Sequence, residues 1–284
     1  MSLEFVSGSY FKSFCKYSVG QYDDARTPRY VFEVKEELNN SLVFVKAEYL
    51  QQFASDFYRG NLELQEDFIL LTHNSDINIT NQVADIVLSW FPKMKRWYAQ
   101  NLCCTHEKLR PLPIGLANPK WSHGNVDRFT KIVNEGCVKD KIYYANFNVA
   151  TNPLARNDCI RKTGINITTN YPNFLILEEH DKFVNSTQDS YLRDMASSYF
   201  VVSPVGNGLD CHKTWEAIYM KSVPIVTQSS MSQEFVSMGL PILVINDWSE
   251  FGNLELSAET YAKIWNQFDI ASLSAEFFIE ELAG

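Results

Sequence analysis

The chain has 284 residues, which suits one large domain or two domains of about 100 to 150 residues each. Hydrophobic residues make up 45% of it and charged residues 21%, as in a globular protein that buries a core. The net charge of −9 disfavours a nucleic-acid-binding surface, because phosphate contacts need a basic field.

In the first half, short apolar runs alternate with longer amphipathic stretches, which predicts an α/β fold. The runs that predict strands are Ser41–Val45, Asp67–Leu71, Arg96–Ala99 and Leu109–Ile114. The predicted helices are Glu48–Phe57, Asn81–Ser89 and Asp127–Glu135. We expect the last helix to connect two halves, so the predicted domains are residues 1–135 and 136–284.

The second half continues the same alternation. Its predicted strands are Lys141–Phe147, Tyr199–Ser203, Val223–Val226 and Pro241–Ile245, and its predicted helices are Ala155–Thr163, Ser186–Ser197, Thr214–Met220, Ala258–Trp265 and Ala275–Leu282. Repeated strand–loop–helix units predict parallel sheets, whose ligands lie beyond the carboxyl ends of the strands. We therefore expect a ligand site in the loops that follow Leu71, Phe147 and Val202.

Cysteine spacing and hydropathy indicate the compartment. None of the six cysteines forms a C-x-x-C pair, so we expect neither a zinc site nor a disulfide framework. Reduced thiols are typical of a cytosol-like compartment. The N-terminus lacks a continuous apolar segment, and no run of 18 apolar residues exists. We expect a soluble cytoplasmic protein without a membrane span.

The segment Ser203–Gly208 (SPVGNG) joins a predicted buried strand to a predicted helix. Glycines there allow positive φ and a close backbone approach to a ligand. Asp210 is the expected N-cap, which places Lys213 in the first helical turn. A cation is unusual at this end of the helix dipole, but it is understandable if an anion such as a diphosphate binds there.

Glu216 follows one turn later, where its carboxylate could accept hydrogen bonds from ribose hydroxyls or simply face solvent. The glycine spacing is neither the G-x-G-x-x-G dinucleotide fingerprint nor a P-loop. A nicotinamide-dependent dehydrogenase is therefore disfavoured.

The run from Ser203 to Val226 resembles the C-terminal nucleotide-sugar-binding motif of exostosin-type glycosyltransferases, particularly the small versions of large DNA viruses of algae. The shared elements are the S-P-x-G-x-G-x-D loop, a basic residue, W-E-A and a final P-I-V strand. Further matching segments are residues 71–76 (LTHNSD), 97–101 (WYAQN), 113–118 (PIGLAN), 121–125 (WSHGN) and 146–148 (NFN), followed by Arg156. Together the resemblance spans residues 65 to 230, roughly.

The resemblance implies a GT-B-like fold, in which two Rossmann-like halves with parallel sheets face a cleft. The C-terminal half would hold the donor and the N-terminal half the acceptor. The implied reaction moves a sugar from a nucleotide-diphosphate sugar, UDP-linked by expectation, to a glycan hydroxyl. No D-x-D motif lies between apolar strand residues, so we expect no metal and no further cofactor. Oligomeric state stays open, and the alternative function is a non-catalytic carbohydrate-binding module with a decayed site.

Roles follow from what glycosyl transfer needs, namely stabilisation of the leaving diphosphate and deprotonation of the acceptor. The expected diphosphate-binding residues are Arg156, Gly206, Gly208, His212 and Lys213, and Glu216 is the ribose candidate. Family members often carry an arginine where this chain has His212 and Lys213, so we expect Arg156 to share the basic role.

The general base is expected just past the strand that ends at Leu71, where Asp76 and His73 are the candidates, with His123 as a third. Each of the first two could instead be a loop residue that caps the following helix. Candidates for sugar contacts are Asp210, Asn74, Asn101, Asn118, Trp121 and His123. Asparagine is also common in turns, and Trp121 could equally fill a core.

Overall fold

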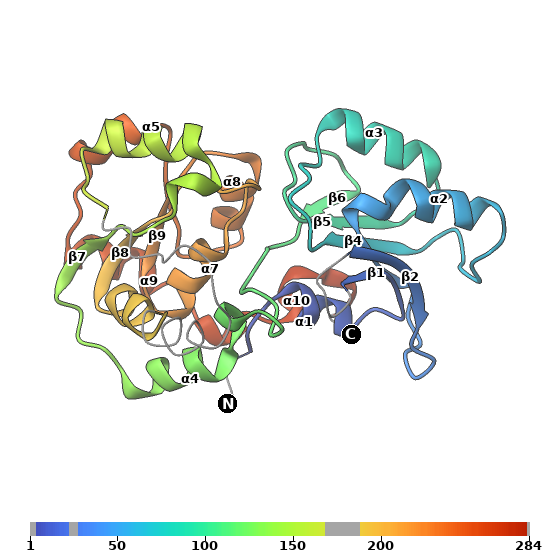
Figure 1. The fold of residues 1–284 in the computed structure, drawn as a ribbon, viewed down its shortest axis with the longest axis horizontal. Helices are drawn as coiled ribbons and strands as arrows, with labels where there is room; N and C mark the ends of the chain where they lie inside the picture. Colours follow the sequence, from blue (N-terminus) through green and yellow to red (C-terminus); the bar gives the residue numbers. More distant parts are fainter. Residues whose placement is uncertain (1–3, 23–27, 168–187, 283–284) are drawn as a thin grey trace. The chain divides into compact units, whose positions relative to one another are not determined.

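The chain is an α/β protein, described by a computed structural model over residues 4–22, 28–167 and 188–282 (Figure 1). Contacts between residues divide it into two compact units. We call Val6–Ile114 with Ala275–Gly284 the N-terminal unit, and Gly115–Ser274 with Met1–Phe5 the C-terminal unit. Each unit carries its own sheet of mostly parallel strands.

The boundary between the units differs from the expected one at 135/136. The helix α4 (Val126–Glu135) belongs to the C-terminal unit, because its polar side chains bind the segment around residue 190. Arg128 Nη1 donates to Gln188 Oε1 at 2.8 Å, and Glu135 pairs with Arg193. Residues 275–282, in contrast, return to the N-terminal unit, where the backbone N–H of Glu280 donates to the Tyr98 hydroxyl at 3.0 Å.

The sheet of the N-terminal unit has the strand order β2-β1-β3-β4-β5-β6, with only the β1–β2 pair antiparallel. Its strands are β1 (Tyr17–Tyr22), β2 (Pro28–Val34), β3 (Leu42–Lys46), β4 (Ile69–His73), β5 (Arg96–Ala99) and β6 (Leu109–Pro111). Its helices are α1 (Gly8–Ser13), α2 (Leu50–Tyr58), α3 (Asn81–Trp90) and α10 (Ala275–Phe278), with 3-10 turns at Ala47–Tyr49 and Glu280–Leu282. In Figure 1, α2 and α3 lie along one side of the sheet, and α1 and α10 lie together on the other.

The sheet of the C-terminal unit has the order β10-β9-β8-β7 and is parallel over the strands described. These are β7 (Lys141–Tyr144), β8 (Ser198–Val202), β9 (Val223–Thr227) and β10 (Leu243–Ile245). Besides α4, its helices are α5 (Pro153–Thr163), residues 188–196, α7 (His212–Tyr219), α8 (Ser230–Ser237) and α9 (Ala258–Trp265). Its 3-10 turns are Ser122–Gly124, Val149–Thr151, Trp248–Asn253 and Ile270–Ser272. The first two residues of the predicted helix Ser186–Ser197 lie outside the described residues.

Burial explains why the apolar runs become strands. Every residue of β3 and β4 is buried, as expected for parallel strands covered by helices on both faces. Aromatic rings fill the space between sheet and helices, where Phe53, Phe68 and Phe91 pack edge-on or tilted within 6 Å of one another. All six cysteines are free thiols. No helix in the described part of the chain is long and apolar enough to cross a membrane.

Candidate functional site

The loop from Ser203 to Cys211 carries the chain from the carboxyl end of β8 into α7. Two of its carbonyls are fixed by α5 and its N-cap, since Asn152 Nδ2 donates to Gly206 O at 2.8 Å and Arg156 Nε donates to Val205 O at 3.1 Å. A Cβ on Gly206 would lie only 3.3 Å from both Arg156 Nη2 and the Cys211 sulfur. The loop is therefore held against Arg156, and a side chain at Gly206 would press on that contact.

The glycines of this loop do not supply positive φ. The described residues with positive φ include Gly115 and Gly164, but neither Gly206 nor Gly208 is among them. The loop therefore does not use the positive φ that its glycines would allow. Gly206 instead provides close packing, because it has no Cβ to meet the guanidinium.

Asp210 is not the N-cap of α7, which corrects the sequence prediction. Cys211 occupies that position, and no side chain caps the helix. The Asp210 carboxylate accepts the indole N–H of Trp215, with Nε1 at 3.1 and 2.9 Å from its two oxygens, and the backbone N–H of Cys211 at 2.9 Å. The reason is burial: Trp215 is wholly enclosed, so its indole N–H needs an acceptor.

Two charged side chains lie buried in the first turns of α7. Lys213 is 8% and Glu216 7% exposed. Between them stands Tyr191, from the helix of residues 188–196. Its hydroxyl accepts a hydrogen bond from Lys213 Nζ at 2.7 Å and donates one to Glu216 Oε2 at 2.6 Å. Burial lowers the pKa of the Lys213 ammonium to about 8; Glu216 opposes this shift, and Arg156 adds to it.

These groups retain unused hydrogen-bonding capacity. Among the described residues, the Lys213 ammonium donates only to Tyr191, and Glu216 accepts only from Tyr191. Arg156 donates from Nε to Val205 O and from Nη1 to Asn148 O at 2.5 Å, which leaves its Nη2 group without an acceptor there. Two cations and one carboxylate that act on one another thus keep donors or acceptors unused, and an anionic ligand with hydroxyl groups would match them.

A second group of side chains gathers where the segment 115–125 meets α7. His212 Nδ1 donates to Gly115 O at 2.7 Å, so this nitrogen carries the proton in the neutral ring. The rings of His123 and His212 lie 6.5 Å apart, and those of Trp121 and His123 lie 6.3 Å apart. The segment is tightly folded, since a Cβ on Gly124 would lie 2.3 Å from a backbone oxygen of this same segment.

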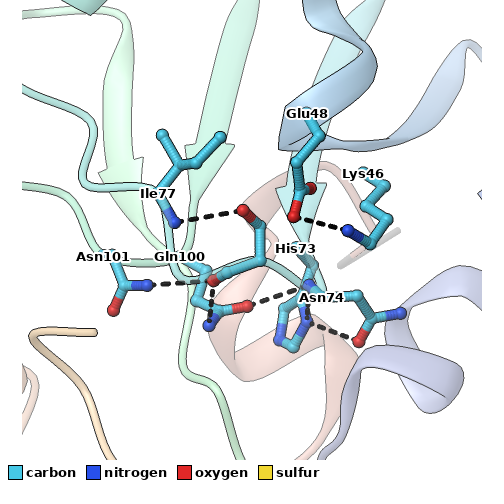
Figure 2. Close-up of polar contacts among 8 residues, drawn as sticks. Lys46, Glu48, His73, Asn74, Ile77, Gln100 and Asn101 are labelled. Carbon is cyan, nitrogen blue, oxygen red and sulfur yellow. Dashed lines mark hydrogen bonds and ion pairs between the residues drawn. The ribbon is translucent and has the colours of Figure 1, made fainter. Parts of the chain in front are cut away.

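Two of the three base candidates, His73 and Asp76, lie in the N-terminal unit at or just past the carboxyl end of β4, and Figure 2 shows His73. His73 is 1% exposed, and its Nε2 donates to Pro113 O at 2.9 Å. Because a carbonyl can only accept, Nε2 carries the proton in the neutral ring. The lone pair is then on Nδ1, which accepts a hydrogen bond from the Asn74 backbone N–H at 2.7 Å. A base role for His73 would therefore require this contact to open. Asp76 is exposed.

The turn after β4 is clamped by β5, which the sequence did not reveal. Asn74 is left-handed, with φ 59°. Its N–H also reaches Gln100 Oε1 at 2.9 Å, while Gln100 Nε2 and Asn101 Nδ2 both donate to Ser75 O, at 2.9 and 3.1 Å. Figure 2 shows these side chains converging on the turn. The Asn101 side-chain amide therefore binds a backbone carbonyl, whereas a sugar contact would need this amide to be exposed to the ligand.

Lys46 is a second feature of this region that the sequence did not reveal. It ends β3, is 3% exposed and pairs with Glu48 at 2.5 Å beside the same turn (Figure 2). The clue available was its position directly after the apolar run Leu42–Val45. Tyr191 gave no such clue, because nothing in its spacing reveals that its hydroxyl meets two buried charges.

Comparisons with known proteins give structural likenesses, among them those to OtsA and HepE. No family model and no curated protein sequence matches the chain. A structure described as OtsA in its apo form is 10% identical, with a TM-score of 0.47 over 86% of this chain and 72% of that one. A structure of HepE from Anabaena, in complex with UDP, is 12% identical, with a TM-score of 0.46 over 86% and 77%. At these values neither likeness assigns a function to this chain.

Proposed function

We propose that this chain is a glycosyltransferase that moves a sugar from a nucleotide-diphosphate sugar to a glycan hydroxyl. The observation that carries the proposal is the pair of buried charges on α7, Lys213 and Glu216, with Arg156 beside the same loop. Buried charges are costly unless something compensates them, so residues of this kind are typical of ligand sites. A diphosphate complements the cations, and the hydroxyls of a ribose complement the carboxylate.

The start of α7 supports a diphosphate in particular. No side chain caps this helix, and the backbone N–H groups of His212 and Lys213 have no partner within the described residues. The first turn also contains no acidic residue. Helix N-termini attract anions through such N–H groups and through the dipole. An anion here would offset both the dipole and the burial of Lys213.

The proposal assigns chemical roles to named residues of each unit. In the C-terminal unit, Lys213, Arg156 and His212 would stabilise the charge that develops on the leaving diphosphate, so the proposal needs no metal. Of the two base candidates in the N-terminal unit, the proposal favours Asp76 over His73, because Asp76 is exposed whereas His73 is buried with both imidazole nitrogens in contact. The likeness of the Ser203–Val226 run to the exostosin-type motif favours a uridine nucleotide.

Nucleotide binding tests the proposal directly. Millimolar UDP, GDP, ADP and CDP are added separately, and the melting temperature is followed; a nucleotide that binds the folded chain raises it. Glu216→Gln should weaken that shift, since the neutral amide is a poorer acceptor for ribose hydroxyls. Glu234→Gln, on the exposed face of α8, is the matched control and should leave it unchanged.

A second assay follows hydrolysis of nucleotide-sugar donors. Release of the nucleoside diphosphate by the parent chain, and its loss in Lys213→Met, would support transfer chemistry. If no nucleoside diphosphate raises the melting temperature, the proposal is wrong. Glycan binding without any nucleotide binding would instead favour the carbohydrate-binding module.

A further inference from the structure

Tyr191 separates two opposite charges that would otherwise meet. Lys213 and Glu216 are three residues apart on α7, a spacing that puts side chains on the same face of a helix. Yet no direct ion pair joins them among the described residues, and the Tyr191 hydroxyl binds both, at 2.7 Å from Lys213 Nζ and 2.6 Å from Glu216 Oε2. Opposite charges attract strongly where water is excluded, so some structural feature must hold these two apart.

The geometry points to Tyr191 as a positioning residue, whose hydroxyl keeps Lys213 and Glu216 apart so that each stays open to the nucleotide. This inference rests on the proposed function. As a spacer, the hydroxyl uses one ammonium N–H and one carboxylate oxygen, and the remaining donors of Lys213 and the second oxygen of Glu216 stay available. A direct ion pair would turn the two groups toward each other and away from a diphosphate and a ribose.

The tyrosine ring and its hydroxyl make separate contributions. Lys213 Nζ lies 4.5 Å from the centre of the Tyr191 ring, a cation–π contact, and the ring of Tyr144 lies 6.0 Å from that of Tyr191. Tyr191→Phe keeps these ring contacts and removes only the hydroxyl. We expect the Lys213 ammonium of this variant to reach the Glu216 carboxylate directly.

The state of Lys213 reports whether that direct pair forms. The ionisable groups that act on it are Glu216 and Cys211 at the start of α7, Arg156 from α5, and the Tyr191 hydroxyl from residues 188–196. In the parent, burial lowers the pKa of Lys213 to about 8 from 10.5. Between these values the unfolded chain binds more protons, so stability rises with pH. A direct ion pair would raise the folded pKa and remove that rise.

The test measures urea unfolding at pH 7.5 and 9.5 and the affinity for UDP. The parent and the control Tyr143→Phe, whose ring is exposed on β7, should both become more stable at the higher pH. Tyr191→Phe should gain less stability than the parent over this range, although the buried Lys139, whose pKa burial lowers to about 7, adds its own rise in every variant. It should also bind UDP about tenfold more weakly, as for the loss of one contact to a charged group. The double variant Tyr191→Phe/Glu216→Gln removes the attraction itself and should regain the parent's increase.

The outcomes separate the spacer role of Tyr191 from the proposed nucleotide-binding function. If Tyr191→Phe gains as much stability with pH as the parent, the spacer is refuted. It is also refuted if the double variant gains less than the parent, and the double variant serves as the test by itself should the single variant fail to fold. If Tyr191→Phe gains less stability than the parent but binds UDP as the parent does, the spacing does not serve the nucleotide, and this part of the inference is wrong. A parent that shows the increase but binds no UDP leaves the spacer standing and removes the proposed function.

Discussion

Replacing Lys213 by methionine should stabilise the fold while it removes nucleotide binding. Lys213 is 8% exposed, and burial lowers its pKa from 10.5 to about 8. One pKa unit corresponds to about 1.4 kcal/mol, so keeping the ammonium charged in the folded chain costs up to about 3 kcal/mol below pH 8. Methionine resembles the neutral lysine in length and carries no such cost.

The pH dependence follows from the sign of this shift. Below pH 8 lysine is protonated in both the folded and the unfolded chain, and the full cost applies. As pH rises from 8 to 10.5 the folded chain releases its proton first, so the parent gains stability and approaches the variant. The advantage of Lys213→Met should therefore be largest near pH 7 and should shrink by pH 10.

Urea unfolding at pH 7 and pH 10, together with UDP titration, measures both effects. Lys263→Met, whose side chain is 70% exposed on α9, is the control and should change neither. The reasoning fails if Lys213→Met is less stable than the parent by the same amount at both pH values, because the buried charge would then carry no net cost. A stabilised variant that still binds UDP like the parent would place the diphosphate elsewhere.

Two further predictions concern a close packing contact at Gly8 and the hydrogen bonds of Arg156. Gly8→Ala would place a Cβ 2.0 Å from Asn74 Oδ1 and should destabilise the chain by about 1–3 kcal/mol, whereas Gly252→Ala, which meets nothing within 4 Å, should have little effect on the urea midpoint. Equal midpoints for the two variants would contradict the clash. Arg156→Lys replaces the two guanidinium nitrogens that bind separate carbonyls by a single ammonium, so it should lower stability by about 1–3 kcal/mol and weaken UDP binding. Unchanged unfolding and binding would show that the guanidinium does not hold the loop.

Local pattern predicted the interior strands and several helices because burial imposes it. Runs such as Ser41–Val45 and Val223–Val226 became β3 and β9 within a residue or two at either end. The outer strands β1 and β2 were missed. The N-terminal half of the chain begins with mixed polar and apolar residues, and at Gly20 a φ of 91° marks the bulge where the β1–β2 register shifts. Such a strand depends on its neighbours for its conformation rather than on its own pattern.

The features of the candidate site also fall into those that local sequence predicts and those that only the structure shows. Glycines and a first-turn cation are local signals, and they pointed to the loop after β8 and to Lys213, with Glu216 one turn later. Arg156 was named through the resemblance to the exostosin-type motif. The sequence could not show that Asp210 serves the indole of Trp215, since that depends on which side chain is enclosed beside it.

The sequence by itself determined that this chain is α/β, where its central strands run and which loop gathers charge, because periodicity and helix-end chemistry act over a few residues. Only the tertiary structure decided where the units divide, which ring nitrogen of His73 carries the proton and how Tyr191 stands between Lys213 and Glu216. Those features depend on contacts between residues 22 to 40 positions apart, or on the return of residues 275–282 to the N-terminal unit. Burial then sets their energies, because charge and hydrogen bonding count for most where water is excluded.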